Sequence, residues 1–158
     1  MSHTMKRITL TLGVGAFLFA VSAPGVRIIR ANERDAGTAQ TPGMTRMAGV
    51  AASTCSAAGI WMGDVTLAPG FRSQPHHHGD VESAIYVISG RLRLRWGDAL
   101  EHEAEAGSGE FIFVPARAVD QEINASDDEP VTQIVARGGD NIVVNVEIAE
   151  SAPSSNHP

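Results

Sequence analysis

The chain has 158 residues, which suffices for one domain and is too short for two of ordinary size. Hydrophobic residues make up 43% of it and aromatic residues only 5%, so a core must form mainly from aliphatic side chains. Twelve basic and eighteen acidic residues give a formal net charge of -6, which argues against binding nucleic acid or an anionic membrane through a basic surface.

Residues 1–25 have the pattern of a secretory signal peptide. Lys6 and Arg7 precede an uncharged, apolar stretch that runs over residues 8–26, with small residues at 21–23. We therefore predict export to the periplasm or the medium. If the segment is instead an N-terminal extension or a strand packed on the domain, the protein is expected in the cytoplasm.

The remainder of the chain has the pattern of strands and turns. A polar, Gly- and Pro-containing segment, residues 32–46, predicts a loop or arm, and so does the charged stretch 101–103. Residues 149–158 predict a flexible C-terminal tail. Runs of β-branched and aliphatic residues that end at Gly or Pro predict strands at 26–31, 60–67, 84–89, 91–96, 110–114, 131–136 and 142–148.

Many short strands without intervening helices predict an all-β fold over residues 26–148, organised as one antiparallel sandwich or barrel. A closed sheet has no sticky edges and leaves an interior that side chains or one small ligand can fill. In residues 91–96 the alternation places Leu92, Leu94 and Trp96 on one face and three arginines on the other. We interpret the arginine face as solvated.

Three consecutive histidines, residues 76–78, follow Pro75 in the middle of the predicted domain. On a strand, His76 and His78 point to the same side and His77 to the other. Glu82 follows closely and offers a carboxylate to the same point. Imidazole and carboxylate together suit iron, manganese, nickel, copper or zinc. The alternative interpretation is a surface loop of solvated histidines.

The spacing around these histidines resembles the two motifs of the cupin family. The first motif matches Gly70, five residues, then 76–78 and Glu82, with Gly90 beyond. The second matches Gly109, five residues, then 115–124, with Pro115 and Asn124 at its fixed positions. The resemblance implies a jelly-roll barrel, also called a double-stranded β-helix, in a single domain. It implies metal ligation by His76, His78, Glu82 and Asp120.

The chain departs from the family pattern at the carboxylate position. Seven residues, not six, separate Glu82 from Gly90, and counting back from Gly90 places Ser83 in the glutamate position. Because neighbours on a strand face opposite sides, only one of the two can face a metal. We favour Glu82, brought inward by a bulge near Gly79, since serine is a poor ligand.

Two further departures lie in the second motif. Asp120 replaces the usual last histidine. As a direct ligand it would make a harder site that favours iron(II) or manganese(II), with nickel(II) or zinc(II) as alternatives; otherwise the fourth ligand is lost and metal is held weakly or not at all. Arg117 replaces the turn glycine, and we expect a turn of different geometry that spares Arg117 a positive φ.

The aromatic side chains Tyr86, Trp96, Phe111 and Phe113 occupy strand positions, and we interpret them as core, with pocket lining as the alternative. By resemblance, the protein is a metal-dependent enzyme that acts on a small organic molecule, of dioxygenase, isomerase or lyase type. The alternative is a non-catalytic binder or sensor of a small ligand with a weak or absent metal. We expect no nucleic-acid partner and no membrane contact beyond the N-terminal segment; cupins are often homodimers, and exposed strand faces would permit one here.

Overall fold

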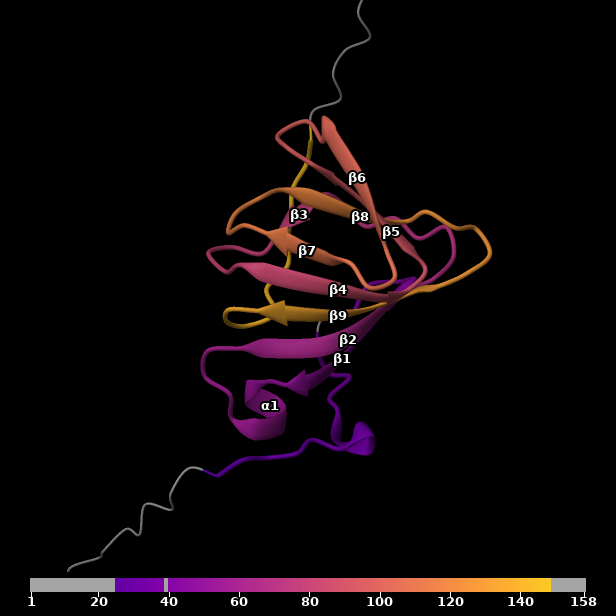
Figure 1. Ribbon diagram of the computed structural model, residues 1–158. Coiled ribbons are helices and arrows are strands. Elements are labelled where there is room, and N and C mark those ends of the chain that lie inside the picture. Colours follow the sequence, from indigo (N-terminus) through magenta and orange to yellow (C-terminus); the bar gives the residue numbers. More distant parts are fainter. Residues whose placement is uncertain (1–24, 39, 149–158) are drawn as a thin grey trace, which may run out of the picture.

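The computed structural model describes residues 25–38 and 40–148, and its strands form two five-stranded antiparallel sheets. The sheets pack against each other as a flattened barrel (Figure 1). The first sheet has the order β1-β2-β9-β4-β7. Its strands are β1 (Met44–Val50), β2 (Trp61–Leu67), β4 (Ser83–Ser89), β7 (Phe111–Val114) and β9 (Val131–Arg137).

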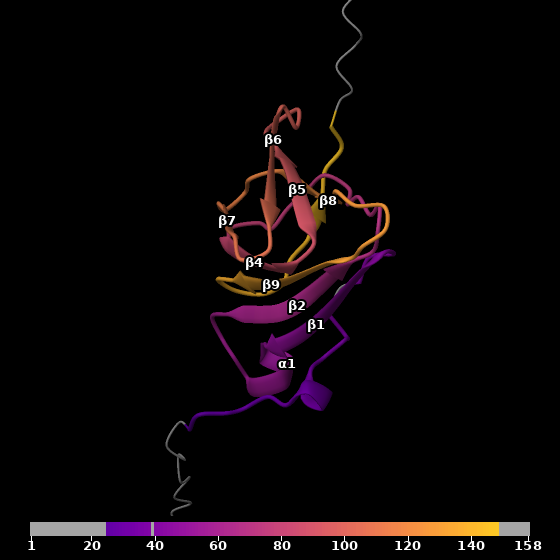
Figure 2. The same cartoon turned by 45° about the vertical axis from the view of Figure 1, so that its right-hand side comes forward.

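The second sheet has the order β10-β3-β8-β5-β6. In the turned view of Figure 2, its strands β5, β6 and β8 lie above β9, β2 and β1 of the first sheet. Its strands are β3 (His76–His77), β5 (Arg91–Trp96), β6 (His102–Gly107), β8 (Asp120–Asn124) and β10 (Val144–Asn145). A short α1 (Ala52–Cys55) and a 3-10 turn (Ala31–Glu33) complete the described elements. None of the helices in the described ranges is long and apolar enough to cross a membrane.

Strict alternation in β9 explains how the barrel acquires its interior. Every second residue from Val131 to Arg137 is buried, and the intervening ones are half-exposed. The register pairs Val131 with Leu67 at one end and Arg137 with Trp61 and Ser83 at the other. The inward side chains therefore change along the strand from aliphatic to charged.

One end of the barrel is an aliphatic core and the other is polar. Leu67, Val87 and Leu92 are fully buried in the aliphatic part, where the removal of apolar side chains from water stabilises the fold. The polar part contains the buried side chains of His76, His78, Ser83, Asp120, Glu122 and Arg137. Hydrophobic packing at one end thus fixes the frame on which a polar site is built at the other.

The all-β jelly-roll prediction is confirmed, and the strands predicted at 60–67, 84–89, 91–96, 110–114 and 131–136 coincide with β2, β4, β5, β7 and β9 to within one residue at either end. The strand predicted at 26–31 is wrong: the segment has two arginines, finds no pairing partner among the described residues and leads into the 3-10 turn. The strand predicted at 142–148 is reduced to β10. The loop predicted at 32–46 ends early, since β1 begins at Met44.

The charged stretch 101–103 is not a loop but lies largely in β6, an edge strand. The glutamates of β6 are paired in register with arginines of β5, and Arg93 donates a hydrogen bond to Glu105 at 2.6 Å. The arginine face of β5 is solvated, as expected, and neutralised by these pairs. The predicted signal peptide, apart from Gly25, and the predicted C-terminal tail lie outside the described residues, so both stay predictions.

The four aromatic side chains are not in the core, where they were expected; Trp96, Phe111 and Phe113 instead line a cavity at the barrel edge, which was the alternative. Phe111 and Phe113 are 77% and 63% exposed, and Tyr86 and Trp96 are also exposed. In β7 the inward positions belong to Ile112 and Val114, so the two phenylalanines point outward. The Tyr86 ring contacts that of Phe111 on the same outer face, with centroids 4.7 Å apart.

Candidate metal centre

The histidine segment enters the barrel as β3, a strand of two residues. His76 pairs with Asp120 of β8 on one side and Asn145 of β10 on the other. Alternation buries His76 and His78 and leaves His77 half-exposed, where its Nδ1 accepts a hydrogen bond from the Gly79 amide. His76 and His78 therefore face the interior of the barrel, as the strand alternation predicted.

Asp120 is the first residue of β8, and its side chain is 2% exposed. The turn that precedes β8 contains Pro115 and Arg117, and the Arg117 amide donates to the Gly79 carbonyl at 2.8 Å. This bond ties the turn to the loop that follows the histidines. Both segments that supply the site are thus held at the same end of the barrel.

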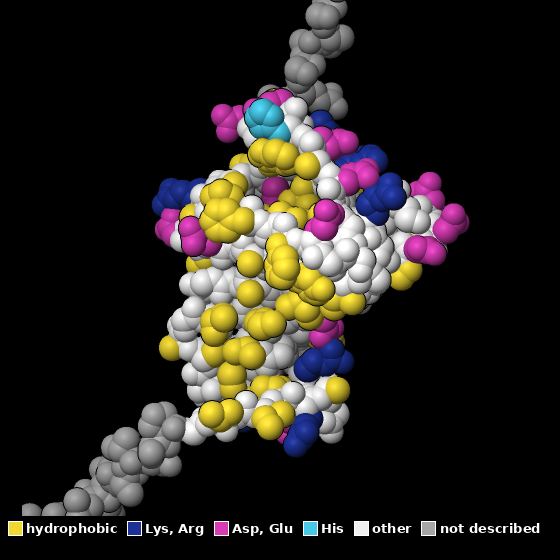
Figure 3. Space-filling view, in the orientation of Figure 1, with side chains coloured by type: hydrophobic (Ala, Val, Ile, Leu, Met, Phe, Trp, Pro, Cys, Tyr) yellow, Lys and Arg dark blue, Asp and Glu magenta, His cyan; other side chains and the backbone are white. Residues whose placement is uncertain are grey.

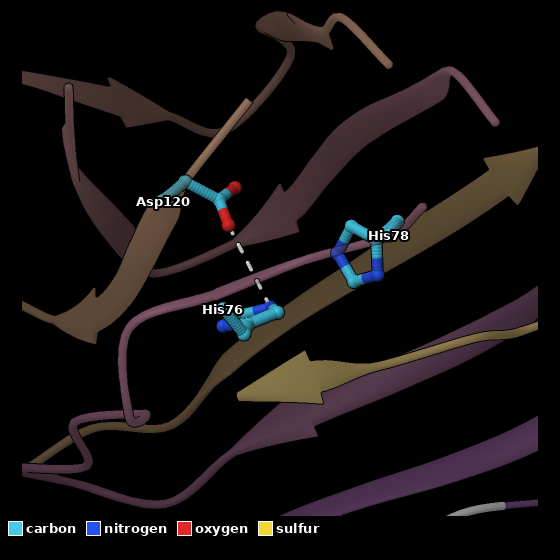
Figure 4. Close-up of side chains that lie close together, drawn as sticks. All are labelled: His76, His78 and Asp120. Atoms are coloured by element: carbon cyan, nitrogen blue, oxygen red, sulfur yellow. Dashed lines mark ion pairs between the residues drawn. The ribbon is translucent and has the colours of Figure 1, made fainter. Parts of the chain in front are cut away.

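The three side chains converge in the barrel interior (Figure 4). His76 Nε2 lies 3.6 Å from Asp120 Oδ1, and the two imidazole rings meet edge to face with centroids 4.8 Å apart. One ligand atom from each of the three residues lies within 4.8 Å of the others. A single ion placed among them could contact all three.

Backbone carbonyls orient both imidazole rings. The carbonyl of Gln74 lies 2.9 Å from His76 Nδ1, and that of Ile142 lies 2.7 Å from His78 Nδ1. A neutral imidazole that donates from Nδ1 has its lone pair on Nε2. This is the arrangement in which a histidine is fixed as a metal ligand by a partner behind it.

Burial shifts the pKa values of all three groups toward their neutral forms. Burial, aided by the positive charge of Arg137, lowers the pKa of His78 to about 3. Burial likewise lowers the pKa of His76. Burial and the nearby Glu122 raise the pKa of Asp120 to about 8. Without a cation, the site at neutral pH therefore holds two neutral imidazoles and a protonated carboxyl group.

These residues fit a divalent metal ion. Asp120 Oδ1 is buried and has no hydrogen-bond partner among the described residues, an arrangement that is costly unless something occupies the site. A cation supplies that partner and reverses the pKa shift of Asp120, because it favours the ionised carboxylate. Two imidazoles and one carboxylate suit iron, manganese, nickel or zinc.

The structure does not bring Glu82 to this site. Glu82 is exposed just before β4, whereas Ser83, the first residue of the strand, faces the interior. The expected bulge near Gly79 does not rotate Glu82 inward; Gly79 has a φ of +65° and turns the chain instead. The preference for Glu82 over Ser83 at the inward position is therefore corrected.

Arg117 does adopt the conformation that was expected to be avoided. Its φ is +62°, so the turn keeps the left-handed geometry that favours glycine. Its exposed side chain forms an ion pair with Asp80. The turn before Asp120 thus keeps its shape despite the substitution, at a cost in backbone strain.

A cavity of about 590 Å³ leads to Asp120 from the edge between β6 and β7. Its lining is mostly apolar and includes Leu94, Trp96, Phe113 and Val114. Figure 3 shows a hollow rimmed by hydrophobic side chains with an acidic group inside it. The volume lies within the range of small-molecule sites.

Sequence reasoning missed the further buried charged residues of the interior, among them Glu122 and Arg137. Both are buried within the polar end of the barrel. A signal for each was present in the sequence, since Glu122 lies two residues after Asp120 and Arg137 continues the alternation of Val131 and Val135. Neither belongs to the spacing of the two motifs.

Comparison with known proteins identifies a domain of known family and structures of similar fold. Residues 63–136 match the family model described as a cupin domain. The structure is similar to oxalate oxidase, with 22% identity and a TM-score of 0.58 over 71% of this chain and 60% of that chain. It is also similar to the polyketide cyclase RemF from Streptomyces resistomycificus, with 21% identity and a TM-score of 0.64 over 80% of this chain and 89% of that one.

A third similar structure is a variant of oxalate decarboxylase OxdC from Bacillus subtilis, with 20% identity and a TM-score of 0.59 over 69% of this chain and 29% of that chain. The chain therefore spans less than two thirds of the oxalate oxidase and of the decarboxylase that it resembles. No curated protein sequence matches it. Residues 63–136 therefore form a cupin domain, and the folds of the similar structures agree with this.

Proposed function

We propose that this cupin is a metal-dependent enzyme that acts on a small organic molecule, with His76, His78 and Asp120 as its metal ligands. The observation that supports this most directly is the convergence of one ligand atom from each of these three buried groups within 4.8 Å, with Asp120 also lining a cavity. Two histidines and one carboxylate favour iron(II) or manganese(II), with nickel(II) and zinc(II) as alternatives. The signal-peptide pattern of residues 1–25 leads us to propose further that the protein acts outside the cytoplasm.

In this proposal, the two histidines and Asp120 hold the ion, and the residues that line the cavity hold the substrate. A bound divalent ion would supply a Lewis-acidic centre with open positions for substrate and, in the case of iron(II), for dioxygen. The carbonyls behind His76 and His78 keep the rings in the ligating orientation. Asp120 loses the proton on its carboxyl group when it ligates, so ion binding and proton release are coupled.

The cavity lining indicates what kind of substrate fits. Trp96, Phe113 and Leu94 offer aromatic and aliphatic surface, which favours an apolar or aromatic body over a small, fully polar one such as oxalate. Two glutamates stand at the cavity wall, but Glu105 is neutralised by Arg93 and Glu110 accepts the Gly107 amide. The apolar walls also exclude water from the approach to Asp120.

Metal content of untagged protein, measured by elemental analysis, tests the proposal. We expect near-stoichiometric iron or manganese in the native chain and less than about a tenth of that in His76→Ala and Asp120→Ala, because each removes one of three ligands. His77→Ala is the matched control, since His77 belongs to the same segment but faces away, and it should keep its metal.

Three other outcomes have distinct meanings. Equal metal loss in His77→Ala and His76→Ala would show that the histidines bind as a surface cluster and would contradict the proposed site. Retention of metal in Asp120→Ala would remove Asp120 from the ligand set. A third outcome is a protein that holds metal and binds aromatic or aliphatic compounds but neither converts them nor takes up oxygen. That outcome would support the alternative function, a non-catalytic binder or sensor.

A further inference from the structure

A buried guanidinium group stands beside the candidate metal centre without a counter-ion in contact. Arg137 is only 5% exposed at the end of β9. It donates from one terminal nitrogen to Ser83 Oγ at 3.0 Å, and its Nε has no hydrogen-bond partner among the described residues. It forms no ion pair within the part of the chain that the structure describes.

Arg137 remains a cation at neutral pH. Burial lowers its pKa to about 10, which is still far above physiological pH. Keeping a desolvated charge without a partner in contact is expensive, and such groups usually pair with an anion. Glu122 is the strongest negative influence on Arg137, but it acts through space and not by contact.

The position of Arg137 relates this charge to the candidate metal centre. In the register of the first sheet, Arg137 of β9 lies beside Ser83 of β4, and Ser83 lies beside Val114 of β7, which lines the cavity that leads to Asp120. The positive charge of Arg137 lowers the pKa values of His76, His78 and Asp120. Arg46, a second buried guanidinium group, adds to the positive potential at the two histidines. A divalent cation at the site would add to it further.

The position held by Ser83 explains why Arg137 is not neutralised. Ser83 is the inward-facing residue opposite Arg137 in the register between β4 and β9. A carboxylate there would form an ion pair with Arg137, whereas the serine hydroxyl accepts one hydrogen bond and leaves the charge uncompensated. The guanidinium group of Arg137 is thus buried opposite a serine of β4 that carries no negative charge.

We propose that Arg137 binds the carboxylate group of the substrate, so that the enzyme acts on small carboxylic acids whose apolar body lies between Trp96 and Phe113. This inference rests on the proposed function and adds to it the class of substrate. The planar guanidinium group accommodates a carboxylate through parallel hydrogen bonds, and its unused Nε is the donor for one of them. Ser83 holds the group in place from behind.

Benzoate is a suitable probe, and benzamide is its neutral isostere. Calorimetric titration of native protein should show benzoate binding at least about tenfold tighter than benzamide, because charge-assisted hydrogen bonds replace neutral ones. In Arg137→Gln, benzoate affinity should fall by at least about tenfold and approach that of benzamide. Arg91→Gln, which removes an exposed arginine from β5, should bind benzoate as native protein does.

Titration of both metal-free and metal-loaded protein separates this inference from the proposed function. Equal benzoate affinity in native protein and Arg137→Gln when both carry metal would show that the ion alone binds the carboxylate, and would overturn the inference while the metal site stands. Benzoate binding that depends on Arg137 in a protein that takes up no metal would support the anion site and contradict the proposed enzyme.

A second variant keeps the test decisive if Arg137→Gln does not fold. Ser83→Ala removes one hydroxyl group and leaves the guanidinium group without its anchor. Benzoate binding should weaken several-fold in Ser83→Ala, while benzamide binding stays unchanged. The same affinity for benzoate and benzamide in native protein, or no benzoate binding at all, would overturn the inference without any variant.

Discussion

At the scale of single residues, Asp120 and the two inward histidines determine how the site responds to protons. Each is buried beside β3 and β8, and each is neutral at pH 7 when no cation is present. Burial acts on acid and base in opposite directions, since it raises the pKa of a carboxyl group and lowers that of an imidazole. In the metal-free protein, the titration of the histidines therefore lowers the free energy of unfolding as the pH falls, and the titration of Asp120 lowers it as the pH rises.

The free energy of unfolding of metal-free protein should have a maximum near pH 6.5. Above it, the pKa of Asp120, raised to about 8 from 3.8, means that the native state holds more protons, so stability falls by up to about 1.4 kcal/mol per pH unit until pH 8. Below it, the pKa of His78, lowered to about 3 from 6.5, means that the unfolded state takes up more protons, so stability falls with decreasing pH. Between pH 3.8 and 6.5, Asp120 offsets the contribution of His78, and the net loss of stability comes from His76, whose pKa burial also lowers.

Urea unfolding between pH 5 and 8.5 measures this profile, and Asp120→Asn is the matched control. The variant lacks the titrating carboxyl group but keeps the histidines, so its stability should not fall between pH 6.5 and 8. The same fall in native protein and variant would show that another group is responsible.

At the scale of elements, the turn between β7 and β8 sets the position of Asp120. Arg117 holds a φ of +62° there, which costs a residue with a Cβ about 1–2 kcal/mol. Its ion pair with Asp80 is exposed and returns little of this cost. The hydrogen bond between the Arg117 amide and the Gly79 carbonyl keeps the turn in this conformation.

Arg117→Gly should raise the free energy of unfolding by up to about 1 kcal/mol, because relief of the left-handed strain exceeds the added entropy of the unfolded chain. Gly79→Ala provides the reverse experiment: its φ is +65°, nothing lies within 4 Å of the added Cβ, and stability should fall by about 1 kcal/mol. Both values come from denaturant unfolding. A loss of stability in Arg117→Gly would mean that the side chain contributes more than its exposed ion pair suggests.

The strands that could be predicted from the sequence are those whose own pattern is strong. Residues 84–89 and 131–136 form apolar or alternating runs between Gly and Pro, and they are β4 and β9. β6 was missed because only one of its six residues is buried, so its identity depends on pairing with the arginines of β5. β3, at two residues, is too short for any periodicity to show.

The candidate site was predictable to the extent that spacing determines it. The motif positions found His76, His78 and Asp120, which the structure brings together. The choice between Glu82 and Ser83 depended on how the chain turns at Gly79, and residue counting does not measure a turn. Arg137 comes from a strand outside both motifs, so only the three-dimensional register relates it to Ser83.

At the scale of the whole molecule, the outer face of the first sheet is unusually apolar. Tyr86, Ile88, Phe111 and Phe113 of β4 and β7 are all exposed there, together with Met62 of β2. Figure 3 shows hydrophobic side chains gathered over these strands. Contiguous exposed apolar surface of this kind marks interaction sites on soluble proteins.

We predict that this outer face is the interface of a homodimer. Light scattering coupled to gel filtration should give native protein twice the mass of one chain, and Tyr86→Ser combined with Ile88→Ser should give the mass of a single chain, because two exposed apolar side chains of β4 are lost from this face. Val26→Ser, which removes an exposed apolar side chain outside both sheets, is the control and should stay dimeric. A monomeric native protein would contradict the prediction.

The hydrogen bond between the His78 ring and the Ile142 carbonyl has a consequence for the C-terminal part of the described chain. Within the described residues, that segment is attached to the barrel through the ladder between β10 and β3 and through the hydrogen bond from the Val146 amide to the Pro75 carbonyl. Any occupant that favours the oriented ring must also favour the docked segment, and by reciprocity a docked segment favours the occupant. The docking of residues 140–146 onto the barrel is therefore coupled to the occupancy of its interior.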